Sequence, residues 1–172
     1  MSKNLISVEN LKYSLGNKIK FSLKIKNFIL KKSDSFLIYG DSGSGKSTFL
    51  NLLSGTLNPQ EGVVKILGKN ISESSSGMKD KLRGDHFGIV FQTFNLLPYI
   101  TVKNNILLGK AYSNRKQLLS SNDEVKILMD KLSLNYKDLV DRKAYELSIG
   151  QQQRVAVARA LIGKPEIIIA DE

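Results

Sequence analysis

The chain has 172 residues, of which 41% are hydrophobic and 24% charged, a composition typical of a globular domain with one buried core and not of a disordered chain. Its 26 Lys and Arg against 16 Asp and Glu give a formal net charge of +10, but the lysines are scattered, which favours a solvated surface over a dedicated nucleic-acid interface. The absence of cysteine excludes disulfides and thiolate metal sites, and the single His86 cannot build a metal cluster. Because the sequence has neither a run of about 20 apolar residues nor an apolar signal core at its N-terminus, we expect a cytoplasmic protein.

The first half of the chain begins with strand patterns and then changes to a helix pattern. Leu5–Leu11 and Phe21–Ile29 alternate apolar and polar residues, which predicts two strands of a partly exposed antiparallel sheet. The continuous apolar run Phe36–Tyr39 predicts a short buried parallel strand that ends at Gly40. Helical spacing over Ser47–Leu57 predicts a helix that stops near Gly55.

Strand and helix patterns continue through the rest of the chain. The predicted elements are a turn at Asn58–Gly62, a strand at Val63–Leu67, a polar loop at Ser72–Gly77, a strand at Phe87–Gln92, helices from Thr101 to about Leu139, a helix at Gly150–Ile162 and a buried strand at Glu166–Ala170. His86 is expected in a turn. This alternation predicts an α/β fold, with a mostly parallel sheet, helices on its faces and an antiparallel N-terminal part.

Residues Gly40 to Ser47 match the phosphate-binding pattern G-x-x-x-x-G-K-[ST], between a predicted strand and a predicted helix. Glycines 43 and 45 allow the backbone to turn successive N–H groups inward, and the following helix adds its own N-terminal N–H groups, including that of Thr48. Lys46 supplies a positive charge for the outer phosphates, and the Ser47 hydroxyl can bind Mg²⁺. The sequence therefore predicts a nucleoside-triphosphate site.

Two acidic residues follow the last predicted strand. In open α/β sheets, ligands bind at the carboxyl ends of the strands, so Asp171 is expected to hold the Mg²⁺ that bridges the phosphates. Glu172 follows it by one residue, so we expect its side chain to point in another direction, from which it could polarise a water for attack on the γ-phosphate.

A second candidate phosphate contact lies in the stretch "ELSIGQQQR". Ser148 is predicted to cap the helix that follows, whose N-terminus offers N–H groups, the positive end of the helix dipole and a hydroxyl. One nucleotide cannot easily touch both this helix tip and the phosphate loop of the same chain if the intervening helices hold them apart. Two chains that share nucleotides would satisfy both contacts.

These motifs together resemble the ATP-binding subunits of ABC transporters, in order and approximate spacing, over essentially the whole chain. The resemblance implies that residues 40–47 are the Walker A loop, that Gln92 is the Q-loop glutamine that touches Mg²⁺ and faces the permease, and that Leu147 to Gln151 are the signature motif. It also implies that Asp171 is the Walker B aspartate and Glu172 the catalytic glutamate. The implied nucleotide contacts are Tyr13, Gly40, Asp41, Ser42, Gly43, Ser44, Gly45, Lys46, Ser47, Thr48, Ser148, Gly150 and Gln151. The implied Mg²⁺ ligands are Ser47, Gln92 and Asp171. The implied catalytic residues are Glu172, Lys46 and Gln92. Tyr13 would stack on adenine, or is a tyrosine at a strand edge.

The resemblance also implies an organisation and a setting. Residues 1–92 and 148–172 would form the nucleotide-binding core, and residues 93–147 a helical subdomain. The stretches "FQTFNLLPYITVKNNI" and "QQQRVAVARAL…ADE" are similar to the subgroup that serves lipoprotein release and macrolide export. We therefore expect an ATPase that pairs with a second copy, powers a transmembrane permease and lies at the inner face of the cell membrane, without direct contact to nucleic acid.

Two departures from the family pattern affect these expectations. The signature normally has two glycines before the glutamine, whereas this chain has Ile149 and Gly150. We therefore expect a weakened or reshaped clamp, the contact that residues 147–151 would make with the γ-phosphate held by the partner chain. The family also continues past the Walker B acids to a switch histidine, and on this basis we expect a truncated domain. Two alternative interpretations remain open: a soluble ABC ATPase that acts on nucleic acid or ribosomes, and a truncated product without turnover.

Overall fold

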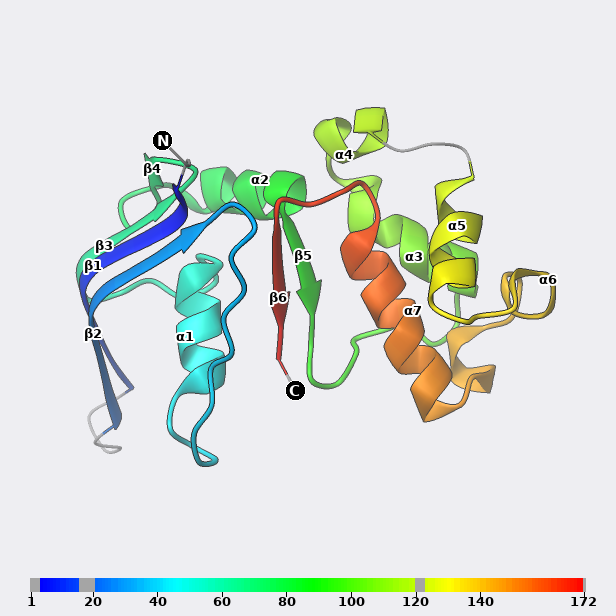
Figure 1. The fold of residues 1–172 in the computed structure, drawn as a ribbon, viewed down its shortest axis with the longest axis horizontal. Coiled ribbons are helices and arrows are strands. Elements are labelled where there is room, and N and C mark those ends of the chain that lie inside the picture. The colour runs from blue at the N-terminus through cyan, green and yellow to red at the C-terminus, as the bar shows by residue number, and fades with distance from the viewer. Residues whose placement is uncertain (1–3, 16–20, 120–122, 172) are drawn as a thin grey trace. The chain divides into compact units, whose positions relative to one another are not determined.

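The computed structural model describes residues 4–15, 21–119 and 123–171 and divides the chain into two compact units, residues 1–83 and 84–172 (Figure 1). None of the helices in these ranges is long and apolar enough to cross a membrane.

The first unit contains an antiparallel sheet with the strand order β2-β1-β3-β4. Its strands are β1 (Asn4–Leu15), β2 (Phe21–Lys31), β3 (Glu61–Ile66) and β4 (Lys69–Asn70). The predicted antiparallel N-terminal sheet is therefore confirmed. The alternation of exposed and half-buried side chains in β2 changes phase between Ile25 and Phe28, as the apolar pattern indicates. On the neighbouring strand β1, Asn10 lies opposite this point and has a positive φ of 50°.

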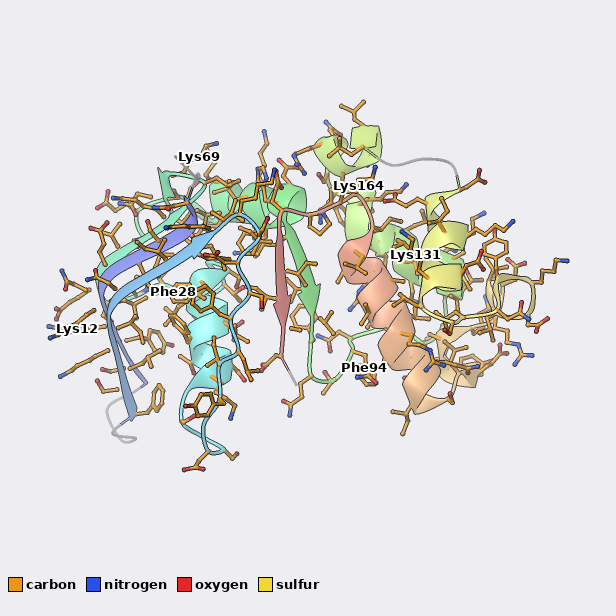
Figure 2. All side chains as sticks on the ribbon, in the orientation of Figure 1. Lys12, Phe28, Lys69, Phe94, Lys131 and Lys164 are labelled. Carbon is orange, nitrogen blue, oxygen red and sulfur yellow. The ribbon has the colours of Figure 1, made fainter. Side chains whose placement is uncertain are left out.

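One face of this sheet packs against α1 (Lys46–Leu53), the helix predicted after the phosphate loop. Phe28 of β2 points toward this helix (Figure 2) and meets Phe49 edge to face, with ring centroids 5.4 Å apart. Val64, Ile66 and Leu52 are also buried in this unit. This packing gives the phosphate loop a rigid support on one side.

The predicted strand at Phe36–Tyr39 is wrong. Residues 34–40 form irregular backbone, and the side chains of Phe36, Leu37 and Tyr39 are 56, 87 and 88% exposed. An apolar run becomes a strand only when another strand accepts its hydrogen bonds, and no strand in the described ranges pairs with this segment.

Helix α2 (Ser76–His86) was not predicted. Its apolar stripe is thin, because only Leu82 and the stem of Lys79 are buried. His86 is the last residue of this helix and not a turn residue, and its Nδ1 lies 2.9 Å from a carboxylate oxygen of Glu166.

The second unit holds a parallel pair, β5 (Phe87–Val90) and β6 (Ile167–Ala170), in the register Phe87–Ile167 to Val90–Ala170. Both strands match the sequence prediction. The β6 strand is buried on one face only, since Ile168 is 53% exposed, and this differs from the expected fully buried strand.

Helices make up the rest of the second unit. They are α3 (Val102–Ala111), α4 (Asn114–Leu119), α5 (Glu124–Lys131), α6 (Tyr136–Leu139), the 3₁₀ turn η1 (Ala144–Glu146) and α7 (Ile149–Leu161). Helices α3, α5 and α7 share one hydrophobic core, which includes Val102, Ile106, Met129, Val155 and Ile162. The α/β class with an antiparallel N-terminal sheet is confirmed, while the division into core (1–92 and 148–172) and helical subdomain (93–147) stays a prediction.

Candidate functional site

The predicted phosphate loop leads directly into the N-terminus of α1. Gly45 is the N-cap residue in the left-handed conformation, with φ 99°, and Lys46 is the first residue of the helix. The first N–H groups of any helix lack intrahelical acceptors and carry the positive end of its dipole. The N–H groups of Lys46, Ser47 and Thr48 therefore form a preorganised anion site at this tip.

Glycine is required inside the loop for two physical reasons. Gly43 and Gly45 both have positive φ, at 80° and 99°, a conformation that favours glycine. A Cβ on Gly45 would also lie 2.4 Å from Cζ of Phe21, the first residue of β2. The Phe21 ring thus packs directly beneath the loop and holds it against the sheet.

Lys46 lies across the loop that it follows. Its Nζ donates to the backbone oxygens of Gly40, at 2.8 Å, and Asp41, at 3.2 Å. The loop is tightened by a turn in which Ser44 N donates to Asp41 O at 3.1 Å. Ser42 and Ser47 are exposed. The Lys46 ammonium is thus held beside the loop backbone, where it can meet the outer phosphates of a nucleotide.

Tyr13 lies on the same sheet face as Phe21, the residue that packs beneath the loop. It pairs with Leu23 across β1 and β2, and directly paired residues project from the same face. Leu23 and Phe21 are two residues apart in β2, so they also share a face. The half-buried Tyr13 therefore lies on the side of the sheet from which Phe21 contacts the loop.

Gln92 and Asp171 lie at the carboxyl edge of the parallel pair. Asp171 follows β6, and its backbone N–H donates to Val90 O, the last residue of β5, at 3.0 Å. Gln92 follows β5 by two residues and is exposed. The structure thus brings these two predicted Mg²⁺ ligands to one edge of the sheet, whereas Glu172 lies outside the described residues.

Ser148 caps the N-terminus of α7, as the sequence predicts, and the structure adds a reciprocal bond from Gln151 that completes a capping box. Ser148 Oγ accepts from Gln151 N at 3.3 Å, and Gln151 Oε1 accepts from Ser148 N at 2.9 Å. These bonds leave the Ser148 hydroxyl proton available for donation, along with the backbone N–H groups of Ile149 and Gly150. Ile149 projects into solvent, with 77% of its side chain exposed.

Sequence reasoning missed a polar anchor of the segment that follows Gln92. Arg159 of α7 donates to the backbone oxygens of Phe94 and Asn95, at 2.5 and 2.6 Å. A signal for it exists in the sequence, because the spacing of Val155, Arg159 and Ile162 places this arginine on the apolar stripe of α7.

Comparison with known proteins decides the family. A family model described as ABC transporter matches residues 23–172. The chain belongs to the ABC transporter family. The matched range includes residues 40–48, Gln92, residues 147–151 and the two C-terminal acids, whereas Tyr13 lies outside it.

Curated relatives of this ABC chain cover nearly all of it. The lipoprotein-releasing system ATP-binding protein LolD of Wigglesworthia glossinidia brevipalpis is 36% identical over 93% of this chain and 69% of its own length. The macrolide export ATP-binding/permease protein MacB of Mannheimia succiniciproducens is 38% identical over 98% of this chain and 26% of its own. These two names match the subgroup that the sequence motifs resemble.

Solved structures of ABC cassettes match the fold. The dimeric structure of MJ0796, a bacterial ABC transporter cassette, gives a TM-score of 0.75 at 34% identity and covers 97% of this chain and 73% of that one. A structure of MJ0796 in a post-hydrolysis state, bound to ADP and Pi, gives a TM-score of 0.76 at 32% identity, with the same coverage. The MJ0796 sequence is from Methanocaldococcus jannaschii.

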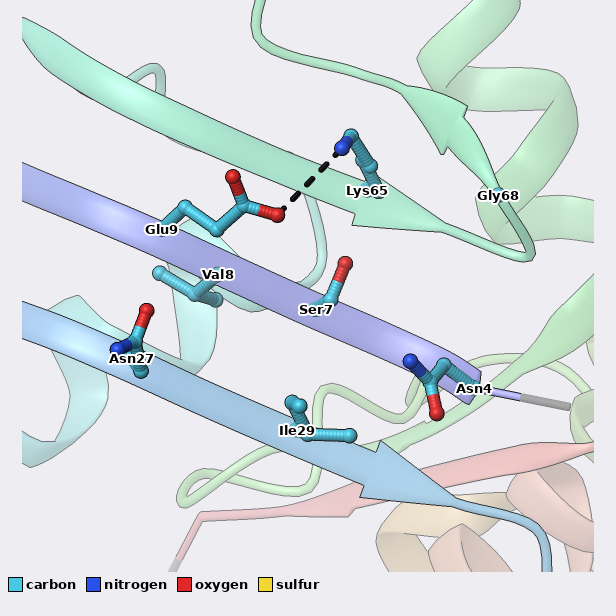
Figure 3. A pocket seen from close by; sticks show the side chains of 8 residues that line it. All are labelled: Asn4, Ser7, Val8, Glu9, Asn27, Ile29, Lys65 and Gly68. Atoms are coloured by element: carbon cyan, nitrogen blue, oxygen red, sulfur yellow. Dashed lines mark hydrogen bonds and ion pairs between the residues drawn. The ribbon is translucent and has the colours of Figure 1, made fainter. Parts of the chain in front are cut away.

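The first unit of this ABC chain also carries a concave surface on its sheet. It crosses β2, β1 and β3 on the exposed side of the sheet, and an ion pair joins Glu9 and Lys65 across it at 3.5 Å (Figure 3). Its lining residues are Asn4, Ser7, Val8, Glu9, Asn27, Ile29, Lys65 and Gly68. None of these lining residues is among the predicted site residues.

Proposed function

We propose that the chain is the ATP-binding and ATP-hydrolysing subunit of an ABC transporter of the lipoprotein-release or macrolide-export type. The observation that carries the proposal is the phosphate loop, whose glycines hold the left-handed backbone that opens α1. Family membership and the names of LolD and MacB support the transport setting.

In this proposal, residues 40–48 hold the triphosphate. Backbone N–H groups of the loop and of the first turn of α1 donate to phosphate oxygens, and Lys46 neutralises the outer phosphate charge. Tyr13 stacks on the adenine. The position of Tyr13 on the same sheet face as Phe21 supports this contact.

The residues assigned to Mg²⁺ fit the ion chemically. Ser47, Gln92 and Asp171 offer hydroxyl, amide and carboxylate oxygens, which are the hard ligands that Mg²⁺ prefers. Mg²⁺ is commonly bound through one or two protein ligands together with the phosphates of its substrate. When bound, Mg²⁺ would neutralise charge on the β- and γ-phosphates.

Hydrolysis would use Glu172 as the general base. Glu172 accepts a proton from a water whose oxygen attacks the γ-phosphorus, and the bond between this phosphorus and the β-phosphate oxygen breaks. Lys46 stabilises the charge that develops on the transferred phosphoryl group. The products are ADP and inorganic phosphate.

A second copy of the chain would complete each nucleotide site. Ser148, Gly150 and Gln151 at the tip of α7 would face the γ-phosphate bound by the partner copy. The dimeric MJ0796 cassette supports the pairing of two copies. The permease would dock near Gln92 and the helical subdomain 93–147. The chain would then lie at the inner face of the cell membrane, held there through the permease.

Measurement of ATP binding and of Mg²⁺-dependent phosphate release tests the proposal. We expect Lys46→Ala to weaken ATP binding about tenfold or more, because it removes a charge-assisted contact. Glu172→Gln should keep ATP binding and lower turnover about 100-fold or more, the usual contribution of a general base. Lys24→Ala, an exposed lysine of β2, is the matched control and should change neither quantity. Wild-type protein that neither binds nor hydrolyses ATP would refute the proposal.

A further inference from the structure

The segment that follows Gln92 has an unusual backbone. Residues 93–97 belong to no helix or strand, and Phe94 and Asn95 are consecutive non-glycine residues with positive φ, at 59° and 46°. Such a pair is uncommon and persists only where surrounding contacts hold it.

Arg159 supplies those contacts from α7. Its Nη2 donates to Phe94 O at 2.5 Å and its Nη1 to Asn95 O at 2.6 Å, so the two nitrogens of one rigid fork grip two consecutive carbonyls. Figure 2 shows Phe94 beside α7. Burial lowers the pKa of Arg159 from its ordinary value, because loss of water penalises the charged form, and these two oxygens offset part of that penalty.

The far end of the same segment is held by α3. Asn105 is fully buried, and its side chain accepts from Leu97 N at 2.8 Å and donates to Leu97 O at 3.0 Å. Helix α3 in turn packs closely on α7, because a Cβ on Gly109 would lie 2.0 Å from Arg159 O. The segment, α3 and α7 are therefore parts of one packed body.

We propose that Arg159 is a positioning residue that fixes residues 93–97 to α7, so that Gln92 and the Ser148 tip of that helix move together. This inference rests on the proposed function, which assigns roles to Gln92 and Ser148. The connection is physically direct, since Thr93 follows Gln92 and a continuous helix of about 16 Å joins Arg159 to Ser148. Arg159 touches neither nucleotide nor metal in this account and acts through the backbone of the segment.

Amide hydrogen exchange in the full chain tests the anchoring without any activity. In Arg159→Gln, the amides of Phe94, Asn95 and Leu97 should exchange about tenfold faster or more, since two charge-assisted bonds are lost. Arg159→Lys should give a smaller rise, because one ammonium lacks the planar fork. Arg142→Gln, an exposed arginine of the same unit, should leave these amides unchanged. Unchanged exchange in both Arg159 variants would overturn the proposal.

Turnover then tests the consequence of the anchoring. In Arg159→Gln, kcat should fall about tenfold while KM for ATP changes less than twofold, because the phosphate loop itself is intact. Binding stoichiometry should stay at that of the wild type, which separates this effect from a loss of folded protein. Arg159→Lys should recover part of kcat. Wild-type kcat in a variant with faster exchange would overturn the proposal.

Failure of the proposed function gives a different pattern. Absence of ATP hydrolysis by the wild type would refute the ATPase assignment, and the exchange comparison would still decide whether Arg159 holds the segment.

Discussion

Gly88 of β5 lies directly against the backbone of Ala160 in α7, and a Cβ on Gly88 would come within 2.0 Å of Ala160 O. The obstacle is backbone and not a flexible side chain, so α7 would have to move away from the parallel pair. We expect Gly88→Ala to lower the free energy of unfolding by about 2 kcal/mol, the usual cost of overpacking. Urea unfolding followed by circular dichroism measures this loss.

A matched glycine separates this contact from the general effect of the substitution. Gly77 lies in α2, and a Cβ there would meet nothing within 4 Å. Gly77→Ala should be neutral or stabilise the protein by up to about 1 kcal/mol, since alanine is the better helix former. An equal loss in both variants would show that the Gly88 contact is not the cause.

Lys116 of α4 is a buried amine that bonds to the backbone. Its Nζ donates to Phe87 O at 2.5 Å and to Gly109 O at 3.2 Å. Lys116→Met keeps the length of the side chain but removes the donor, which leaves acceptors without this partner. We expect a loss of about 2 kcal/mol in the free energy of unfolding at neutral pH. If Lys116→Met were as stable as the wild type, these hydrogen bonds would not contribute to stability, and the prediction would be wrong.

The stability of the wild type should also depend on pH through Lys116. Burial, and secondarily the positive charge of Arg115, lowers the pKa of this amine below its ordinary value of 10.5. The folded chain then releases the proton at lower pH than the unfolded chain does, so stability rises as pH climbs from the folded pKa toward 10.5. The stability difference between wild type and Lys116→Met should therefore widen over this range. A stability difference between the two proteins that narrows with rising pH would contradict a lowered pKa of Lys116 in the folded chain.

Tyr13 offers a test of the adenine contact. Tyr13→Ala should weaken ATP binding about fivefold, within the range of one aromatic contact, while Tyr13→Phe should keep the affinity. Tyr112, which is 90% exposed in the second unit, is the matched control for loss of a surface tyrosine. Wild-type affinity in Tyr13→Ala would support the alternative of a tyrosine at a strand edge.

Ile149 is the departure in the signature motif, and its exposure makes it easy to test. Because 77% of its side chain is exposed, Ile149→Gly should change the free energy of unfolding by less than about 1 kcal/mol. We expect ATP hydrolysis equal to or above that of the wild type. Ile149→Ala distinguishes the side chain from backbone flexibility. A large loss of hydrolysis in both variants would show that this isoleucine contributes to the clamp.

Local motifs of this protein could be predicted from the sequence, because their geometry is set within a few residues. The capping box joins Ser148 and Gln151, three positions apart, and the left-handed Gly45 opens the helix that begins at the next residue. Backbone conformation and capping bonds of this kind need no distant partner. The β2 phase shift was visible for the same reason, since alternation is a property of one strand.

Contacts between distant segments were decided only by the tertiary structure. Phe36–Tyr39 has the composition of a buried strand, but strand formation depends on a pairing partner that the run itself does not contain. Arg159 reaches carbonyls 64 and 65 residues earlier in the chain, and the pattern of α7 shows only that a charge lies on its apolar stripe. The sequence thus determined the backbone of the predicted phosphate loop and the Ser148 cap, because both follow from short-range geometry. It also determined the family, because the order and spacing of the motifs along the chain match a family model. The tertiary structure decided which strands pair and which side chain holds the segment after Gln92, because hydrogen-bond partners and burial depend on segments that meet only after folding.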